Sequence, residues 1–348
     1  MPTKLSEWAS WLAESGWLVV LLLVPVFFNP YTERIFEEDK IPLLRSVALV
    51  VGFALVVWIV ERGRDGLRLG ERSLWRTPLV RPALALTAIY ALSTLLSVLP
   101  SISLWGAHIR RQGLATWLGY IIIFFAVLLF LRTRAQVSRL TTLLMITSVP
   151  PSLYGFMQNQ GLDPIPWGGD VVERVSSTAG NPIFISAYLI MVLPVTLMIA
   201  LQAFRRLVSA ADGESRDTGT ALLAGGLLFL LLLQSMTILF SQSRGPLIGL
   251  GVGLVFFGIL YALPRSRAAT LSIIGLTVAA MGFLAIFNLP DSPLAPLRDV
   301  RYVGRLGQVL EISSGTGLVR TLIWEGAVDL IAYVAQQAYP LLKRGIRI

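Results

Sequence analysis

Long apolar runs alternate with short polar segments along most of the chain. A helix needs about 20 residues to cross a hydrocarbon core of about 30 Å, and nine of the runs approach or reach that length. They lie at residues 11–28, 43–60, 82–99, 114–131, 140–157, 182–204, 219–240, 246–263 and 269–288. The pattern predicts an all-α polytopic membrane protein with about nine transmembrane helices.

The last sixty residues depart from this pattern. The Pro-rich segment LPDSPLAPLRDV leaves the ninth run, and ISSGTG interrupts the chain again before LVRTLIWEGAVDLIA. In that stretch one face of the expected helix is made of apolar residues and one glycine, namely Val319, Leu322, Ile323, Gly326, Leu330 and Ile331. We therefore expect a helical bundle over residues 1–288 and an extracytoplasmic segment over residues 289–348, with an amphipathic helix on the outer surface or against the bundle.

Composition agrees with a membrane protein and excludes several kinds of site. The chain is 55% hydrophobic and 14% charged, with a mean hydropathy of +0.72, whereas a soluble domain of this length needs more charge on its surface. Cysteine is absent and His108 is the one histidine, which excludes disulfides, thiolate sites and a histidine metal cluster. We expect no metal and no cofactor.

The distribution of basic residues predicts the orientation. Placing the N-terminus in the cytoplasm puts about twice as many Lys and Arg inside as outside, as the positive-inside rule requires. This topology explains the net charge of +9 better than nucleic-acid binding does. The first run is expected to be retained, since Lys4 is offset by Glu7 and Glu14 and FFNPYTER lacks a small-residue cleavage site.

Several arginines then lie on the outer side, against the insertion rule. They are Arg110 and Arg111 after the third run, Arg174 after the fifth, Arg244 in the turn SQSRGP, and Arg320 in the tail. A guanidinium group matches a phosphate with a planar fork of donors, and a groove of reduced dielectric strengthens that contact. The alternative, that Arg244 and Arg174 only reach lipid headgroups, stays open.

Other polar and aromatic residues give weaker signals. His108 is expected to be an interfacial side chain, and Trp105, Trp117 and Trp167 fit an aromatic belt. Between residues 82 and 288 every acidic residue lies in a loop. A proton-coupled transporter normally needs an ionisable relay inside the membrane, so this pattern disfavours that class.

Five segments, in order along the chain, resemble motifs of the O-antigen ligase family. This family comprises lipid-linked glycan ligases, related polymerases and bacterial O-oligosaccharyltransferases. SQSRGPLIGLGVGLVFF is similar to the Ser-Arg-Gly turn that opens a span in the family. The others are WGAHIRRQGLATWLGY, YGFMQNQGLDPIPW, STAGNPIFISAYL and SSGTGLVRTLIWEGAVDLIA.

The resemblance implies a bundle of the glycosyltransferase C type and a metal-free transfer at the outer face of the bacterial cytoplasmic membrane. A glycan would pass from an undecaprenyl diphosphate carrier to a hydroxyl of a lipid or protein acceptor, in cell-surface polysaccharide biosynthesis. By position in the motifs, Arg244 and Arg320 would bind the diphosphate and stabilise its charge as it leaves. Arg110, Arg111, Arg174 and Asn181 would assist in substrate binding, and no nucleic acid would take part.

The sequence also departs from the family pattern in one respect, and alternative functions stay open. Family members carry a histidine in a large outer loop after the helix that corresponds to Arg320, followed by further spans, whereas this sequence has no histidine after His108 and no apolar run after residue 288. We therefore expect a C-terminally truncated member that lacks the last spans. The alternatives are a transporter or flippase of lipid-linked sugars, a structural membrane subunit, and an inactive fragment.

Overall fold

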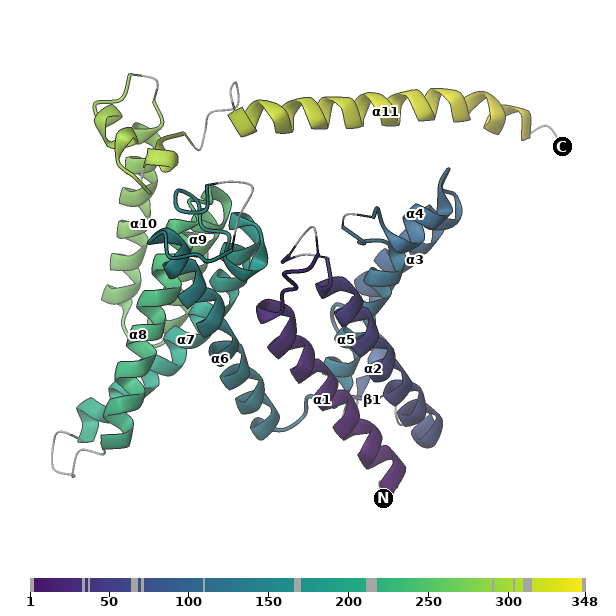
Figure 1. The fold of residues 1–348 in the computed structure, drawn as a ribbon, viewed down its shortest axis with the longest axis horizontal. Coiled ribbons are helices and arrows are strands. Elements are labelled where there is room, and N and C mark those ends of the chain that lie inside the picture. The colour runs from purple at the N-terminus through teal and green to yellow at the C-terminus, as the bar shows by residue number, and fades with distance from the viewer. Residues whose placement is uncertain are drawn as a thin grey trace. The chain divides into compact units, whose positions relative to one another are not determined.

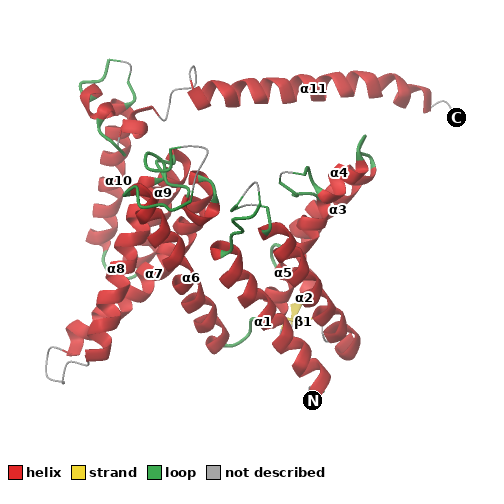
Figure 2. Cartoon of the chain, in the orientation of Figure 1, coloured by secondary structure: helices red, strands yellow, loops and turns green. Residues whose placement is uncertain are grey.

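The computed structural model describes most of the chain. The described residues are 3–32, 35–36, 38–63, 68–69, 72–108, 110–165, 170–210, 218–289, 291–302, 304–308 and 315–345. These residues are mainly helical, and their extended part is a two-residue antiparallel ribbon, in which Arg68 of β1 (Arg68–Leu69) faces Ser73 of β2 (Arg72–Ser73) (Figure 2).

The helices have the following bounds in chain order (Figure 1): α1 Lys4–Val26, α2 Lys40–Arg62, α3 Val80–Leu95, α4 Pro100–Trp105, α5 Leu114–Phe130, α6 Arg134–Asn159, α7 Pro182–Ala210, α8 Thr218–Phe240, α9 Arg244–Ala262, α10 Arg267–Phe287 and α11 Gly315–Gly345. Short 3-10 turns lie between them: η2 Leu74–Arg76, η3 Ser177–Ala179, η4 Ala295–Asp299 and η5 Gly304–Gln308.

A helix is present at each of the nine predicted runs. In the described part of the chain, seven helices are long and apolar enough to cross a membrane, namely α1, α2, α6, α7, α8, α9 and α10. The protein is therefore a multi-pass helical membrane protein. Helices α3 and α5 have 16 and 17 residues and are shorter than these seven. α3 ends at Leu95, before the turn that leads into Pro100.

Several helices extend beyond their predicted limits. α1 begins at Lys4 and not at residue 11, and α7 continues to Ala210 and not only to residue 204. α6 begins at Arg134 and not near residue 140, because Thr133 and Gln136 form a reciprocal capping box at its start. α11 contains the predicted amphipathic helix and continues to Gly345, through a stretch where the sequence has no clear period.

The chain forms two compact units, residues 1–254 and residues 255–348, which are described separately. In the first unit, α1, α2 and α5 pack around an apolar core that includes Trp17, Val51 and Phe130. Gly16 allows the close approach of α1 and α2, since a Cβ atom there would lie 2.1 Å from a methyl carbon of Val51.

A polar seam joins α6, α7 and α8 inside the same unit. Gln234 is fully buried, and its Nε2 donates to Ser148 Oγ at 2.8 Å and to Thr196 Oγ1 at 3.2 Å. One turn further along α8, Thr237 Oγ1 donates to the carbonyl oxygen of Ser152 at 3.0 Å. Hydrogen bonds between helices in an apolar medium fix their mutual register.

Glu14, midway along α1, connects this helix to the first turns of α6. Its carboxylate accepts from Arg139 Nε at 2.9 Å and Nη2 at 2.5 Å, and from Gln136 Nε2 at 2.9 Å. The Glu14 side chain is 16% exposed, so these three donors compensate a charge that is largely removed from solvent.

In the second unit, the segment after α10 folds back onto the end of that helix. Arg298 Nη2 donates to the carbonyl oxygens of Phe287 and Leu289, at 2.8 and 2.6 Å. These are terminal carbonyls of the kind that a helix leaves unsatisfied, so Arg298 acts as a C-terminal cap. On α11, the apolar residues from Leu318 to Tyr333 are exposed.

Candidate anion-binding site

Four loops of the first unit meet at one end of its helices. Lys40 at the start of α2 donates to the carbonyl oxygen of Thr178 at 2.6 Å, and Thr178 Oγ1 donates to that of Pro25 at 2.7 Å. Arg111 pairs with Glu38 at 2.8 Å, and the amide of Val175 donates to the carbonyl oxygen of Phe240. The loops after α1, α4, α6 and α8 therefore share one end, which we call the loop end.

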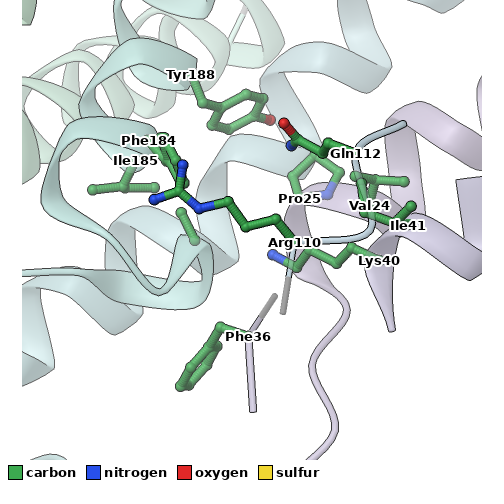
Figure 3. Close-up of a pocket in the computed structure, with 11 residues that line it drawn as sticks. Val24, Pro25, Phe36, Lys40, Ile41, Arg110, Gln112, Phe184, Ile185 and Tyr188 are labelled. Carbon is green, nitrogen blue, oxygen red and sulfur yellow. The ribbon is translucent and has the colours of Figure 1, made fainter. Parts of the chain in front are cut away.

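A pocket of about 280 Å³ lies at the loop end, and we call it the Arg110 pocket (Figure 3). It is formed by α1 and the loop after it, α2, the loop before α5, η3 and the start of α7. Its lining residues are Val24, Pro25, Phe36, Lys40, Ile41, Arg110, Gln112, Ala179, Phe184, Ile185 and Tyr188.

The charges in this pocket have one sign. Lys40 and Arg110 both line it, and none of the described lining residues is acidic. Figure 3 shows Arg110 extending toward Phe184 and Ile185, with the side chains of Gln112 and Tyr188 at the same side of the pocket. Two cations between apolar walls, with a phenol and an amide beside them, suit a phosphate-bearing ligand that also has an apolar part.

The loop that presents Arg110 is tightly closed. Gly106 has φ +87°, and a Cβ atom on it would lie 2.3 Å from the amide nitrogen of Gln112. Arg45 of α2 is hydrogen-bonded to the backbone of this loop, since its Nη2 donates to the carbonyl oxygens of Trp105 and Arg111 at 2.8 and 2.5 Å. This geometry fixes where the Arg110 side chain leaves the backbone.

Arg111 does not enter the Arg110 pocket. It has φ +49°, its guanidinium pairs with Glu38, and it lines a second pocket of about 460 Å³. We call this the Arg45 pocket, and its lining residues are Pro42, Arg45, Ser46, Leu49, Trp105, Gly106, His108 and Arg111. Arg110 and Arg111, adjacent in the sequence, thus line different pockets.

The segments that carry Arg174 and Arg244 lie side by side. Gln242, in the turn before Arg244, is 6% exposed, and its Nε2 donates to the carbonyl oxygen of Glu173 at 2.8 Å. The same turn is joined to α7 by a hydrogen bond between Ser186 and Ser241. Arg244 is the first residue of α9, and neither arginine is among the described residues that line the Arg110 pocket.

Asn181 has a structural role at the start of α7. Its Oδ1 accepts from the amide of Ile183 at 2.8 Å, and its backbone carbonyl accepts from Phe184 and Ile185. These are the contacts of a helix N-cap, followed by Pro182 at the first helical position. Asn181 thereby sets the course of the turn that places Phe184 and Ile185 in the pocket.

The remaining predicted residues are distributed over both units. Arg320 lies on α11 in the second unit and is exposed, so its action together with Arg244 stays a prediction. His108 lines the Arg45 pocket, and Trp167 lies outside the described residues. Among the described residues no group of three or more His, Asp or Glu is placed to hold a metal ion.

Lys40 and Gln158 are the residues that the sequence reasoning missed. Lys40 is a cation on the outer side in the predicted topology, and that position was the signal that could have singled it out. Gln158 is fully buried, accepts from the amides of Ser176 and Ser177, and donates to Asp163 at 2.8 Å. Its position in the polar run QNQ at the end of an apolar segment was a signal of this kind.

Comparisons of the chain with protein-family models, with curated proteins and with solved structures give no match.

Proposed function

We propose that this protein is a glycosyltransferase of the cytoplasmic membrane that uses a polyprenyl diphosphate-linked glycan as its donor. The observation that carries the proposal is the Arg110 pocket, where Lys40 and Arg110 meet between apolar and aromatic walls. A carrier lipid has the matching parts, a diphosphate followed by an isoprenoid chain. The resemblance to the O-antigen ligase family supports the same assignment.

In the proposed topology the N-terminus is cytoplasmic, the chain crosses the membrane nine times and the loop end faces outward. Helices α3 and α5 are then short spans, of about 24 and 26 Å at 1.5 Å per residue. A bilayer accommodates such spans by local thinning. This orientation places Arg110, Arg174 and Arg244 on the same side as the glycan-bearing end of the carrier.

The proposed reaction is an inverting transfer. The acceptor hydroxyl oxygen forms a bond to the anomeric carbon, the bond from that carbon to the phosphate oxygen breaks, and the hydroxyl proton passes to a base or to water. The carrier diphosphate leaves with the bonding electrons. Cations that already surround this diphosphate stabilise the charge that develops on it, which is the contribution expected of arginine and lysine in a metal-free site.

Arg244 is assigned to the same diphosphate in this proposal. It is placed at the N-terminus of α9, where the helix dipole adds to the attraction of an anion. The turn before it is buried and tied to α7 and to the 173–175 segment, so the guanidinium leaves a fixed backbone. Arg320 would contribute from the second unit.

A transfer assay tests the proposal. The purified full chain in proteoliposomes is given an undecaprenyl diphosphate-linked glycan and candidate acceptors, and acceptor glycosylation is measured. Lys40→Gln and Arg110→Gln are expected to reduce transfer, whereas Arg134→Gln, exposed at the start of α6, serves as the matched control. Movement of the carrier across the bilayer without glycan transfer would instead identify a flippase and contradict the proposal.

A further inference from the structure

The Arg45 pocket lies on the other side of the start of α2 from the Arg110 pocket, and the proposed transfer does not use it. α2 contributes Lys40 and Ile41 to one pocket and Pro42, Arg45, Ser46 and Leu49 to the other. We infer that the Arg45 pocket binds the phosphate of an anionic phospholipid, whose acyl chain lies along α2. This inference does not depend on the proposed function.

The guanidinium group of Arg45 is fixed by hydrogen bonds and keeps further N–H donors that a ligand can use. Its Nε and Nη2 donate to Thr116 Oγ1 at 2.9 and 2.7 Å, and Nη2 also reaches the carbonyl oxygens of Trp105 and Arg111. Nη1 makes no hydrogen bond to the described residues, so it retains two donors for a ligand. A guanidinium fixed in this way loses little freedom when it binds a phosphate.

The charges around the pocket favour an anion. Arg45 and Arg111 line it, and the one described carboxylate in contact with either of them is that of Glu38, bound to Arg111. One positive charge therefore remains in excess. Trp105 lines the pocket and is 55% exposed, and the centroid of its ring lies 5.6 Å from the guanidinium carbon of Arg45. Tryptophan is typical of the boundary between headgroups and acyl chains.

An exposed apolar stripe on α2 continues from the pocket. Leu49, which lines the pocket, is 71% exposed, and Phe53, Val56 and Val60 are 60%, 59% and 77% exposed. Their spacing of four, three and four residues places them on one side of the helix. The pocket therefore opens directly onto a surface that an acyl chain can cover.

The length of this stripe favours a phospholipid over a polyprenol. From Leu49 to Val60 the helix rises about 17 Å at 1.5 Å per residue, close to the ~15 Å of one leaflet's hydrocarbon region. One acyl chain of a phospholipid covers that distance. A polyprenyl chain is much longer than the stripe, so the stripe would cover only part of it.

Native mass spectrometry of the purified full chain tests this inference, with phosphatidylglycerol and phosphatidylethanolamine added at equal concentrations. The wild type is expected to retain phosphatidylglycerol in preference. Ser46→Trp fills the pocket from an exposed position without touching the hydrogen bonds of Arg45, and should lower that occupancy at least about fivefold. Leu95→Trp, exposed on α3, is the matched control and should retain the lipid.

A charge series gives a second, independent readout. Glu38→Gln should raise the affinity for phosphatidylglycerol about fivefold and Arg111→Gln should lower it by a similar factor, as expected for one charge near a lipid surface. The double variant should return close to the wild type. Equal retention of both lipids, or no difference across the series, would overturn the inference, as would displacement of phosphatidylglycerol by equimolar undecaprenyl phosphate.

Discussion

Arg110 and Arg111 are adjacent in the chain, yet they line different pockets. Arg110 enters the pocket that it shares with Lys40, whereas Arg111 pairs with Glu38 and lines the Arg45 pocket. The positive φ of Arg111 and the closed loop between Gly106 and Gly113 produce this divergence. Two neighbouring arginines can therefore serve two different anions.

Substitution of each arginine in turn should affect the binding of a polyprenyl diphosphate differently. Arg110→Gln should weaken binding of a polyprenyl diphosphate about ten- to hundredfold, because a hydrogen bond to a charged group contributes about 1.5–3 kcal/mol. Arg111→Gln should weaken it by less than about threefold, because Arg111 does not line that pocket. Titration of the purified protein with a fluorescent polyprenyl diphosphate measures both, and equal effects would contradict the assignment.

The loop that presents Arg110 should depend on Gly106. Gly106→Ala places a Cβ atom 2.3 Å from the amide nitrogen of Gln112 at φ +87°, in a region that other residues adopt at a cost of about 1–3 kcal/mol. The variant should have a lower melting temperature in detergent and weaker ligand binding. Gly225→Ala on α8, where a Cβ atom meets nothing within 4 Å, should keep the wild-type melting temperature.

The long segment between α6 and α7 should depend on Gln158 for its stability. Gln158→Leu leaves the amides of Ser176 and Ser177 without their acceptor, and each unsatisfied buried group costs about 1–3 kcal/mol. Hydrogen exchange in residues 170–181 should become faster. Gln160→Leu, at an exposed position two residues away, is the control, and an equal change in that variant would refute the role of Gln158.

The ion pair between Glu14 of α1 and Arg139 of α6 predicts that its two single substitutions destabilise the protein to different extents. Arg139→Gln leaves the carboxylate of Glu14, 16% exposed, without its charged partner, whereas Glu14→Gln removes the charge itself. The first change should therefore destabilise the protein more than the second, by about 1 kcal/mol because Arg139 is 53% exposed. A double-mutant cycle of unfolding in mixed micelles measures the difference, and the reverse order would rule out this account.

The helices were predictable because each apolar run has to satisfy its own backbone hydrogen bonds in a membrane. The residues at which the helices begin and end were less predictable. The start of α6 depends on the side chains of Thr133 and Gln136, which form a capping box before the apolar run begins. The end of α3 depends on a local turn before Pro100, which hydropathy does not detect.

The Arg110 pocket was predictable only in part. Arg110 stood out as a cation on the predicted outer side, but its partner Lys40 is brought there by Thr178, which is 138 residues away from Lys40 and 153 from Pro25. Contacts of this separation leave no periodic trace in one sequence. The loops of Arg174 and Arg244 were likewise expected on one side, while their direct contact through Gln242 was not.

The polar seam between α6, α7 and α8 has a consequence for how the protein enters the membrane. α6 is the least apolar of the seven candidate spans among the described residues, and its Ser148 hydroxyl and Ser152 backbone carbonyl both accept hydrogen bonds from α8. A translocon that releases α6 alone would expose these groups to lipid. We therefore expect the translocon to retain α6 until α8 has been synthesised. A glycosylation reporter should record poor membrane insertion of α6 when it is expressed without α7 and α8.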